Sequence, residues 1–288
     1  MKDGVKNMQD FPKVIELQLQ NKCNSFCLIC PYKDMNYHFE KMPNELFEKI
    51  IIEISKHPIQ RLIPYLNNEP FLDPNYIEKI YFIRKMLPNV EIEISSNASL
   101  LTENIARKLV ELNITELRLS IFGYDETTYK KMMPGLDKNV VFKNLNDISK
   151  ILKGTNITTT IIMIDNDKIN DEEFKKMEIF ANNLGFEFEK WGYLDRCKNV
   201  KWKSNNIYKR NVIGCEQKRP LERMHILANG KVIFCCQDWS HTLIMGDINK
   251  ESIYEIWNSN YYNQLRNSIY KKEENAIELC KNCKLALV

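Results

Sequence analysis

The chain has 288 residues, 44% hydrophobic and 27% charged, an ordinary globular composition that excludes disordered and collagen-like proteins. Its net charge of +3, from 41 basic and 38 acidic residues, is too small for a dedicated nucleic-acid-binding protein. No apolar run approaches the roughly 20 residues of a membrane span, and the first eleven residues lack the apolar segment of a signal peptide. We therefore expect a cytoplasmic protein of about two domains.

Six strands are predicted to alternate with helices over residues 14–191. The strands show two-residue alternation or β-branched composition, at 14–20, 62–66, 90–94, 117–121, 158–164 and 186–191. The helices between them carry apolar stripes at helical spacing, near 43–54, 77–84, 102–112, 125–133, 140–152 and 171–184. This order predicts an α/β fold with a parallel sheet, either doubly wound or a partial barrel.

The pattern changes after residue 191. Residues 192–214 are irregular and basic, and are expected to form a linker between domains rather than a nucleic-acid-binding surface. The later predicted elements are a hairpin with strands 224–227 and 231–235 around Ala-Asn-Gly, and two short helices near 252–258 and 260–268.

Nine cysteines are the unusual part of the composition. They stand at positions 23, 27, 30, 197, 215, 235, 236, 280 and 283. Disulfides are unfavourable in a reducing cytoplasm, and an odd number of clustered cysteines indicates metal binding or catalysis.

The first cysteine cluster, Cys23-Asn-Ser-Phe-Cys27-Leu-Ile-Cys30, directly follows the first predicted strand. Three thiolates on one short loop can hold three irons of a [4Fe–4S] cluster and leave the fourth iron open to an external ligand. A structural zinc site needs four closed ligands, usually as two CxxC-like pairs. The loop therefore predicts an iron–sulfur cluster with one open position.

This CxxxCxxC loop, placed after the first of six strands, resembles that of the radical S-adenosylmethionine (SAM) superfamily. Three further strand ends fit the family pattern: Asn67-Asn68-Glu69-Pro70 where the family carries Gly-Gly-Glu-Pro, Ser95-Ser96-Asn97 where it often has Thr-Asn-Gly, and Ser120. The resemblance covers about residues 12–191. It implies a partial (βα)6 TIM-type barrel in residues 1–195, with these motifs at the carboxyl ends of strands.

The resemblance also implies roles for individual residues. Cys23, Cys27 and Cys30 would ligate the reducing cluster, whose open iron would take the amino and carboxylate groups of SAM. The implied SAM contacts are Glu69 and the backbone near Asn68 to the ammonium, Asn97 and Ser120 to the ribose, and Ile29 to the adenine. The chain departs from the family where Asn67-Asn68 replaces a glycine pair and where Ile29 replaces a common aromatic residue.

A second set of four cysteines lies in the C-terminal part: Cys215, Cys235, Cys280 and Cys283. Their spacing alone fits zinc and an iron–sulfur cluster about equally. The surrounding sequence is similar to the shortened "twitch" form of the SPASM domain, as in the dehydrogenases of 2-deoxystreptamine antibiotic biosynthesis. This resemblance implies a linker and a domain with one auxiliary [4Fe–4S] cluster in residues 196–288.

Two cysteines remain outside these sets. Cys197 lies in the predicted linker and is expected to have no specific role. Cys236 follows Cys235 in a predicted strand, so we expect it on the opposite face. There it is either a packing residue or a hydrogen-atom donor, as a similarly placed cysteine is in some radical SAM epimerases. The histidines, at 38, 57, 225 and 241, show no ligand spacing and are expected at surface or packing positions.

The resemblance implies an enzyme that generates a 5′-deoxyadenosyl radical, which abstracts hydrogen from a small molecule. Net oxidation of a sugar or cyclitol, with the auxiliary cluster as electron acceptor, is the favoured reaction. The alternatives are epimerisation with Cys236, modification of a ribosomal peptide (disfavoured because only about 12 residues precede the first strand), and a non-enzymatic zinc-bound interaction module. The expected partners are the substrate and an electron donor such as flavodoxin or ferredoxin, without nucleic acid or membrane.

Overall fold

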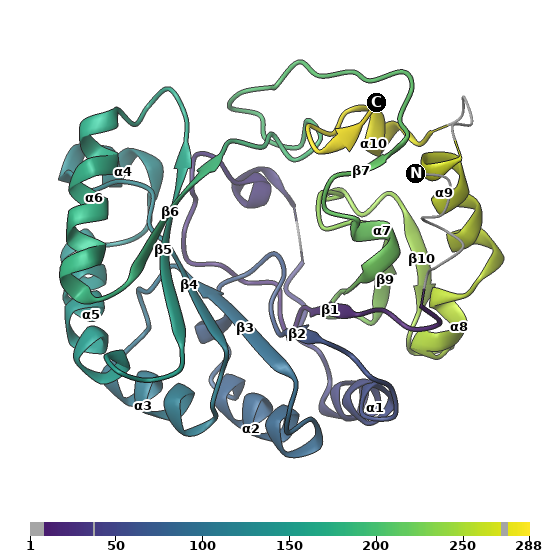
Figure 1. The fold of residues 1–288 in the computed structure, drawn as a ribbon, viewed down its shortest axis with the longest axis horizontal. Coiled ribbons are helices and arrows are strands. Elements are labelled where there is room, and N and C mark those ends of the chain that lie inside the picture. The colour runs from purple at the N-terminus through teal and green to yellow at the C-terminus, as the bar shows by residue number, and fades with distance from the viewer. Residues whose placement is uncertain (1–8, 37, 272–275) are drawn as a thin grey trace. The chain divides into compact units, whose positions relative to one another are not determined.

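The structure is a computed structural model that describes residues 9–36, 38–271 and 276–288 (Figure 1). The first eleven residues, in which we expect no signal peptide, lie mostly outside the described part of the chain. No helix of the described chain is long and apolar enough to cross a membrane. The chain forms two compact units. Unit 1 contains the residues up to Gln20, Asp34–Leu66 and Leu194–Val288, and unit 2 contains Asn21–Lys33 and Asn67–Tyr193.

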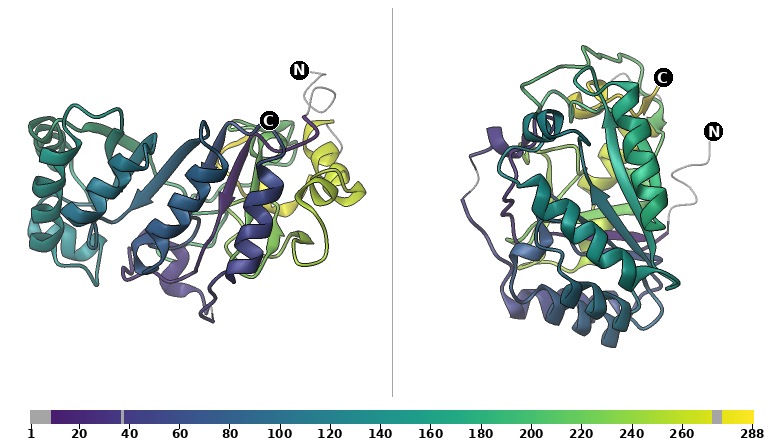
Figure 2. Two further views of the ribbon diagram at one scale, coloured as in Figure 1. Left: turned by 90° about the horizontal axis from the view of Figure 1, so that it is seen from below. Right: turned by 90° about the vertical axis from the view of Figure 1, so that its left-hand side faces the viewer.

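Unit 2 contains a parallel sheet in the order β3-β4-β5-β6, with helices along one side of it (Figures 1 and 2). Its strands are β3 Glu91–Ser96, β4 Glu116–Ser120, β5 Thr158–Asp165 and β6 Glu187–Gly192. Its helices are α2 Tyr76–Met86, α3 Glu103–Glu111, α4 Glu126–Met132, α5 Lys138–Leu152 and α6 Asp171–Leu184. The predicted alternation of strands and helices is confirmed for this part of the chain.

Local signals set the ends of two of these helices. The Thr102 hydroxyl oxygen accepts a hydrogen bond from Ile105 N at 3.4 Å and caps α3, as predicted. Helix α6 ends at Gly185, whose left-handed backbone (φ +75°) provides the predicted C-terminal cap. In β4, Leu117 and Leu119 are fully buried, and the alternating Ser120 side chain points to the other face. Ser120 thus presents a polar side chain at the carboxyl end of β4.

Unit 1 contains a sheet in the order β10-β9-β8-β1-β2. Its strands are β1 Val14–Leu17, β2 Arg61–Ile63, β8 Arg223–Ile226, β9 Lys231–Ile233 and β10 Ile244–Asp247, and helix α1 spans Asn44–Ile54. The predicted hairpin is confirmed as the antiparallel pair β8–β9. Strand β8 also pairs in parallel with β1, with Ile15 opposite Met224, which the sequence analysis did not anticipate. The first strands therefore pack with C-terminal residues.

Short elements complete unit 1 around the later cysteines. Strand β7 (Gly214–Cys215) pairs antiparallel with β11 (Ala286–Leu287), and the helices are α7 Arg219–Glu222, α8 Ile253–Trp257, α9 Asn260–Tyr270 and α10 Glu278–Lys281. Helices α8 and α9 match the two predicted short helices. Arg266 is fully buried and donates hydrogen bonds to Pro220 O at 2.8 Å and Trp257 O at 2.6 Å. This side chain ties α7, α8 and α9 together.

Candidate cluster and cofactor sites

The turn after α4 holds the first cysteine loop in place. Phe26 N donates a hydrogen bond to Pro134 O at 2.9 Å. Gly135 in this turn has φ +96°, and a Cβ atom there would lie 2.8 Å from Asn24 O. Only glycine allows the turn to approach the loop so closely. No local sequence signal marks this glycine, because its role depends on a contact with a loop more than 100 residues away.

Buried sulfur atoms dominate the loop. Burial raises the pKa of the Cys23 thiol to about 12, although amide groups of Ser25 and Asn24 donate to its sulfur. Burial likewise raises the pKa of Cys27, whose Sγ lies 3.0 Å from Ser25 Oγ. Such thiols stay protonated until a metal supplies positive charge. The loop thus presents ligands whose ionisation is coupled to metal binding.

Glu69 is a buried carboxylate between the cysteine loop and the end of β3. It is 2% exposed, and Oε1 accepts hydrogen bonds from Ser96 Oγ at 2.8 Å and Phe71 N at 3.3 Å. Oε2 accepts from Asn97 N at 2.8 Å. Burial raises its pKa to about 7, although these hydrogen bonds favour the charged form. A carboxylate kept in such a place is suited to meeting a cationic ligand.

Asn97 connects this carboxylate to the cysteine loop. Its backbone N–H donates to Glu69, and its Nδ2 donates to Asn24 Oδ1 at 2.8 Å. Asn24 Nδ2 in turn donates to Ser99 Oγ at 2.9 Å. Three motifs that lie far apart in the sequence therefore meet in one network within unit 2. Ser96 belongs to this network as well, although the sequence analysis gave it no role.

The remaining predicted SAM contacts, Asn68, Ser120 and Ile29, lie in the same unit as Asn67, which was not predicted to bind SAM. Asn67 is 5% exposed, and its Nδ2 has no hydrogen-bond partner within the described chain. An unpaired buried donor costs about 1–3 kcal/mol, so the loop fits a ligand that supplies an acceptor, such as the SAM carboxylate. Ser120 Oγ lies 3.4 Å from Ser95 Oγ, and Ile29 is buried. The assignment of Ser120 to ribose and of Ile29 to adenine stays a prediction, as does that of Asn68 to the ammonium.

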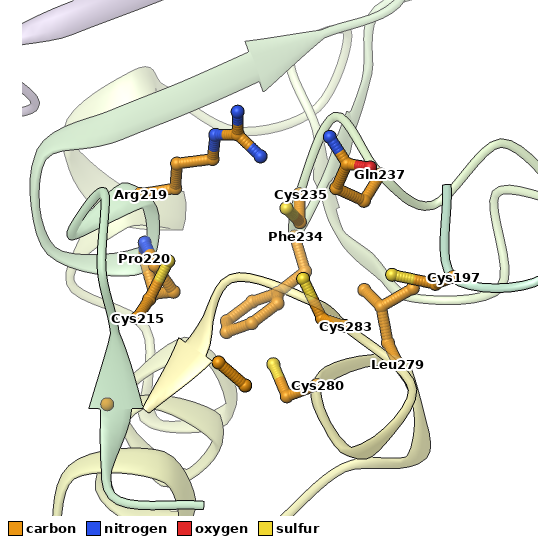
Figure 3. A pocket seen from close by; sticks show the side chains of 12 residues that line it. Cys197, Cys215, Arg219, Pro220, Phe234, Cys235, Gln237, Leu279, Cys280 and Cys283 are labelled. Carbon is orange, nitrogen blue, oxygen red and sulfur yellow. The ribbon is translucent and has the colours of Figure 1, made fainter. Parts of the chain in front are cut away.

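The second set of predicted ligands lines a single cavity in unit 1 (Figure 3). Cys215 ends β7, Cys235 follows β9, Cys280 lies in α10, and Cys283 follows that helix. The structure thus brings together four cysteines from three separate parts of the chain.

Backbone amides prepare several of these sulfurs to act as thiolate ligands. The sulfurs of Cys215, Cys235 and Cys283 each accept a hydrogen bond from the amide two residues later, at Gln217, Gln237 and Leu285. Hydrogen bonds of this kind orient a ligand and stabilise its negative charge. Such an arrangement fits a metal centre better than a set of ordinary packing cysteines.

The sulfur atoms of the two predicted sets can be compared with the geometry of a single zinc site. Four sulfurs at 2.3 Å from zinc lie about 3.8 Å apart in a tetrahedron. Within the described residues, the one group of three His, Cys, Asp or Glu ligand atoms within 4.8 Å of one another is His225, Cys235 and Cys236. Neither predicted cysteine set is gathered tightly enough for a mononuclear zinc site.

Cys197 also lines the cavity, although the sequence analysis expected no role for it. Its thiol shares a hydrogen bond with that of Cys283. Arg196, Cys197 and Lys198 all have left-handed backbones, with φ values of 52°, 55° and 69°. Left-handed conformations cost about 1–2 kcal/mol for each such residue. No local spacing marks Cys197 as a metal-site residue, so only the fold reveals it.

Cys235 lines the cavity and Cys236 does not, but neither lies in a strand as expected. Strand β9 ends at Ile233, so the two cysteines lie in a turn, where strand alternation does not apply. Their thiols share a hydrogen bond, and a His225 nitrogen lies within 4.8 Å of both sulfurs. His225 is fully buried and lies 3.2 Å from Glu16. Burial opposes charge on both partners, but their attraction lowers the pKa of Glu16 to about 2 and raises that of His225.

Comparison with protein families gives two matches. The model of the radical SAM superfamily matches residues 17–180, and that of SPASM, an iron–sulfur cluster-binding domain, matches residues 215–284. Among curated proteins, the chain is 21% identical over 276 residues to "S-adenosyl-L-methionine-dependent 2-deoxy-scyllo-inosamine dehydrogenase" of Niallia circulans. That match covers 94% of this chain and 92% of the relative.

Solved structures show the same fold. BtrN in complex with AdoMet and 2-DOIA matches with a TM-score of 0.65 at 17% identity, over 96% of this chain and 94% of the other. Streptococcus suis SuiB bound to the precursor peptide SuiA matches with a TM-score of 0.76 at 13% identity, over 96% and 74%. The predicted α/β fold with a C-terminal SPASM-type domain is confirmed.

Proposed function

Because the chain belongs to the radical SAM superfamily, whose model matches more than half of it, we propose that it is a dehydrogenase acting on a small sugar-like or cyclitol-like alcohol. The family supplies the enzyme class and the cofactors, which are a [4Fe–4S] cluster, SAM and an auxiliary iron–sulfur cluster in the SPASM domain. The substrate class and the net oxidation are our proposal. They are supported by the dehydrogenase relative, which this chain matches along nearly its whole length.

The number of cysteines at the two sites carries the proposal. Three cysteines on the first loop leave one iron open for SAM. Four predicted ligands line the second cavity, enough to ligate every iron of a cubane. A cluster without an open iron suits electron transfer rather than binding of the substrate. An oxidation requires such an acceptor, because the substrate must lose a second electron after its hydrogen atom.

The residues of unit 2 bind and orient SAM in this proposal. When bound, the first cluster supplies the electron that cleaves SAM into methionine and a 5′-deoxyadenosyl radical. Glu69 accepts a hydrogen bond from the SAM ammonium, and Asn67 Nδ2 donates to its carboxylate. Asn97 and Ser120 approach the ribose, and Ile29 contacts the adenine. Asn24, which accepts a hydrogen bond from Asn97, keeps these SAM-binding residues aligned with the cysteine loop.

The net reaction removes two hydrogens from a carbinol. The substrate would give one hydrogen atom to the deoxyadenosyl radical and then lose one proton to a base and one electron, for which the auxiliary cluster held by Cys215, Cys235, Cys280 and Cys283 would be the acceptor. The test is an anaerobic assay of the reconstituted protein with dithionite, SAM and a panel of cyclitols and aminocyclitols. We expect a product two hydrogens lighter than its substrate, with one 5′-deoxyadenosine formed for each product. Flavodoxin or ferredoxin as electron donor, and the cytoplasmic location, stay predictions.

Epimerisation is the second candidate. The observation that favours it is the Cys236 thiol, which lies beside the predicted ligand Cys235 and could return a hydrogen atom. Its product would have the same mass as the substrate and would carry one deuterium from D2O. Peptide modification rests on likeness of fold alone, since SuiB is 13% identical, and the same assay with a peptide substrate tests it.

A further inference from the structure

Arg219 is a buried cation that the proposed reaction has not used. It begins the short helix α7, is 9% exposed, and lines the cavity with the predicted auxiliary-cluster ligands. In Figure 3 its side chain extends toward the part of the cavity where Cys235 and Gln237 lie. A fixed positive charge therefore borders the space that four thiolates share.

The hydrogen bonds of Arg219 leave one donor without a partner. With its amide oxygen turned toward the arginines, Gln237 accepts from Arg219 Nη1 at 3.0 Å and from Arg196 Nη1 at 2.8 Å. Arg219 Nε has no hydrogen-bond partner within the described chain. A charged donor left unpaired in a buried position is costly. The occupant of the cavity is therefore expected to supply an acceptor, and cluster sulfurs are acceptors.

Most of the groups that can carry a negative charge near Arg219 are cysteines. Once they are ionised by a metal, Cys215, Cys235 and Cys283, three of the four predicted ligands, would attract its guanidinium, as would Cys236, while Glu16 is a carboxylate nearby. Glu16 is in addition paired with Arg223 at 3.4 Å and His225 at 3.2 Å, so its charge is already offset. The net positive charge of Arg219 thus remains directed at the cavity.

We propose that Arg219 raises the reduction potential of the auxiliary cluster and so makes it a better electron acceptor. A [4Fe–4S]2+ core with four thiolates carries a net charge of −2, and one electron takes it to −3. A nearby positive charge and a hydrogen bond to sulfur both stabilise the more negative state. Arg219 is thus a positioning residue at which no bond forms or breaks. The inference rests on the proposed oxidation, in which the electron comes from the substrate radical.

The experiment measures the potential directly, without substrate. The full-length chain with Cys23, Cys27 and Cys30 replaced by Ala holds only the auxiliary cluster, which an EPR-monitored titration with dithionite and mediators can follow alone. In this background, Arg219→Gln should keep about four irons per chain. The midpoint reduction potential of the cluster should fall by at least about 59 mV, which is a tenfold change in a one-electron equilibrium. In Arg219→Lys, which keeps the positive charge but lacks Nε, the potential should fall by a smaller amount.

Arg223→Gln is the matched control. It removes an arginine from the same segment that does not line the cavity, and His225 still pairs with Glu16 at 3.2 Å. The one-electron equilibrium of the cluster should therefore change less than twofold. An unchanged midpoint in Arg219→Gln at full iron content would overturn the proposal. Loss of the cluster in both Arg219 variants would also overturn it, because Arg219 would then serve assembly. If Arg219→Gln lowers the midpoint potential while the wild-type enzyme forms a product of the same mass as its substrate, the role of Arg219 is supported and the proposed oxidation is wrong.

Discussion

One substitution, Glu69→Gln, should raise the stability of the chain and lower its affinity for SAM. Burial raises the pKa of Glu69 from 4.5 to about 7. At about 1.4 kcal/mol for each pKa unit, the ionised carboxylate destabilises the cofactor-free fold by about 3 kcal/mol. This penalty is absent below pH 4.5, where the folded and unfolded chains are both protonated, and it is fully present above pH 7.

Glutamine can keep most of the local hydrogen bonds. Its amide oxygen can accept from Asn97 N, and its NH2 group can donate to Ser96 Oγ. The 3.3 Å bond from Phe71 N is the one of the three that is lost. The variant should therefore be more stable than the wild type by about 3 kcal/mol at pH 8, with little difference near pH 4.5. Its SAM affinity should nevertheless fall about 10- to 100-fold, because a hydrogen bond to a charged group contributes about 1.5–3 kcal/mol.

Two measurements test this reasoning. Urea denaturation of the reduced, cluster-free chain, followed by circular dichroism at pH 4.5 and pH 8, gives the stability difference. Calorimetry with the reconstituted protein gives the SAM affinity. Ser96→Ala is the control. It removes two hydrogen bonds, one to Glu69 Oε1 and one from Ala98 N, but keeps the carboxylate. It should cost about 1–3 kcal/mol with SAM affinity nearly unchanged. A Glu69→Gln variant that binds SAM as tightly as the wild type, or that is less stable than the wild type at pH 8, would contradict this prediction.

Replacing Cys23, Cys27 and Cys30 together by Ala should lower the iron content from about eight to about four per chain and stop 5′-deoxyadenosine formation. Stoichiometric zinc in the purified protein would contradict both clusters. Cys236→Ala should leave turnover largely intact. Loss of product while 5′-deoxyadenosine still accumulates, with solvent deuterium in the wild-type product, would favour epimerisation. Gly135→Ala should destabilise the chain by more than about 1 kcal/mol, because φ is +96° and the methyl group would meet a carbonyl oxygen. An unchanged urea midpoint would show that the turn can relax.

Local periodicity was sufficient to predict the order of elements up to β6. Leu117 and Leu119 alternate with polar residues in β4, and Gly185 ends α6, so each signal lies within its own element. The parallel pairing of β1 with β8 was not predictable in this way. It pairs Ile15 with Met224, which lies about 200 residues later in the chain. A parallel pair has no short turn between its strands, so no local sequence signal marks it.

The sites were predictable to the extent that their residues form local motifs. The CxxC at Cys280 and Cys283 is such a motif, and both residues line the expected cavity. Cys197 reaches the same cavity through a loop with no spacing signal. The placement of Cys235 and Cys236 in a strand was wrong because β9 ends two residues before Cys235, and the exact end of a strand is weakly encoded. The partners of Glu69 belong to the next strand and emerge only from the fold.

The position of β1 between β2 and β8 has a consequence for biosynthesis. One edge of β1 stays without its partner until about 200 further residues have been translated, which takes about 10 to 40 s at ribosomal rates of 5–20 residues per second. An open strand edge can pair with other chains during this interval. Unit 1 cannot close its sheet before β8 emerges, and the cavity formed by later residues is completed only afterwards. Iron–sulfur loading at the auxiliary site must therefore be a late event in the maturation of this protein, and slower translation would lengthen its exposure to aggregation.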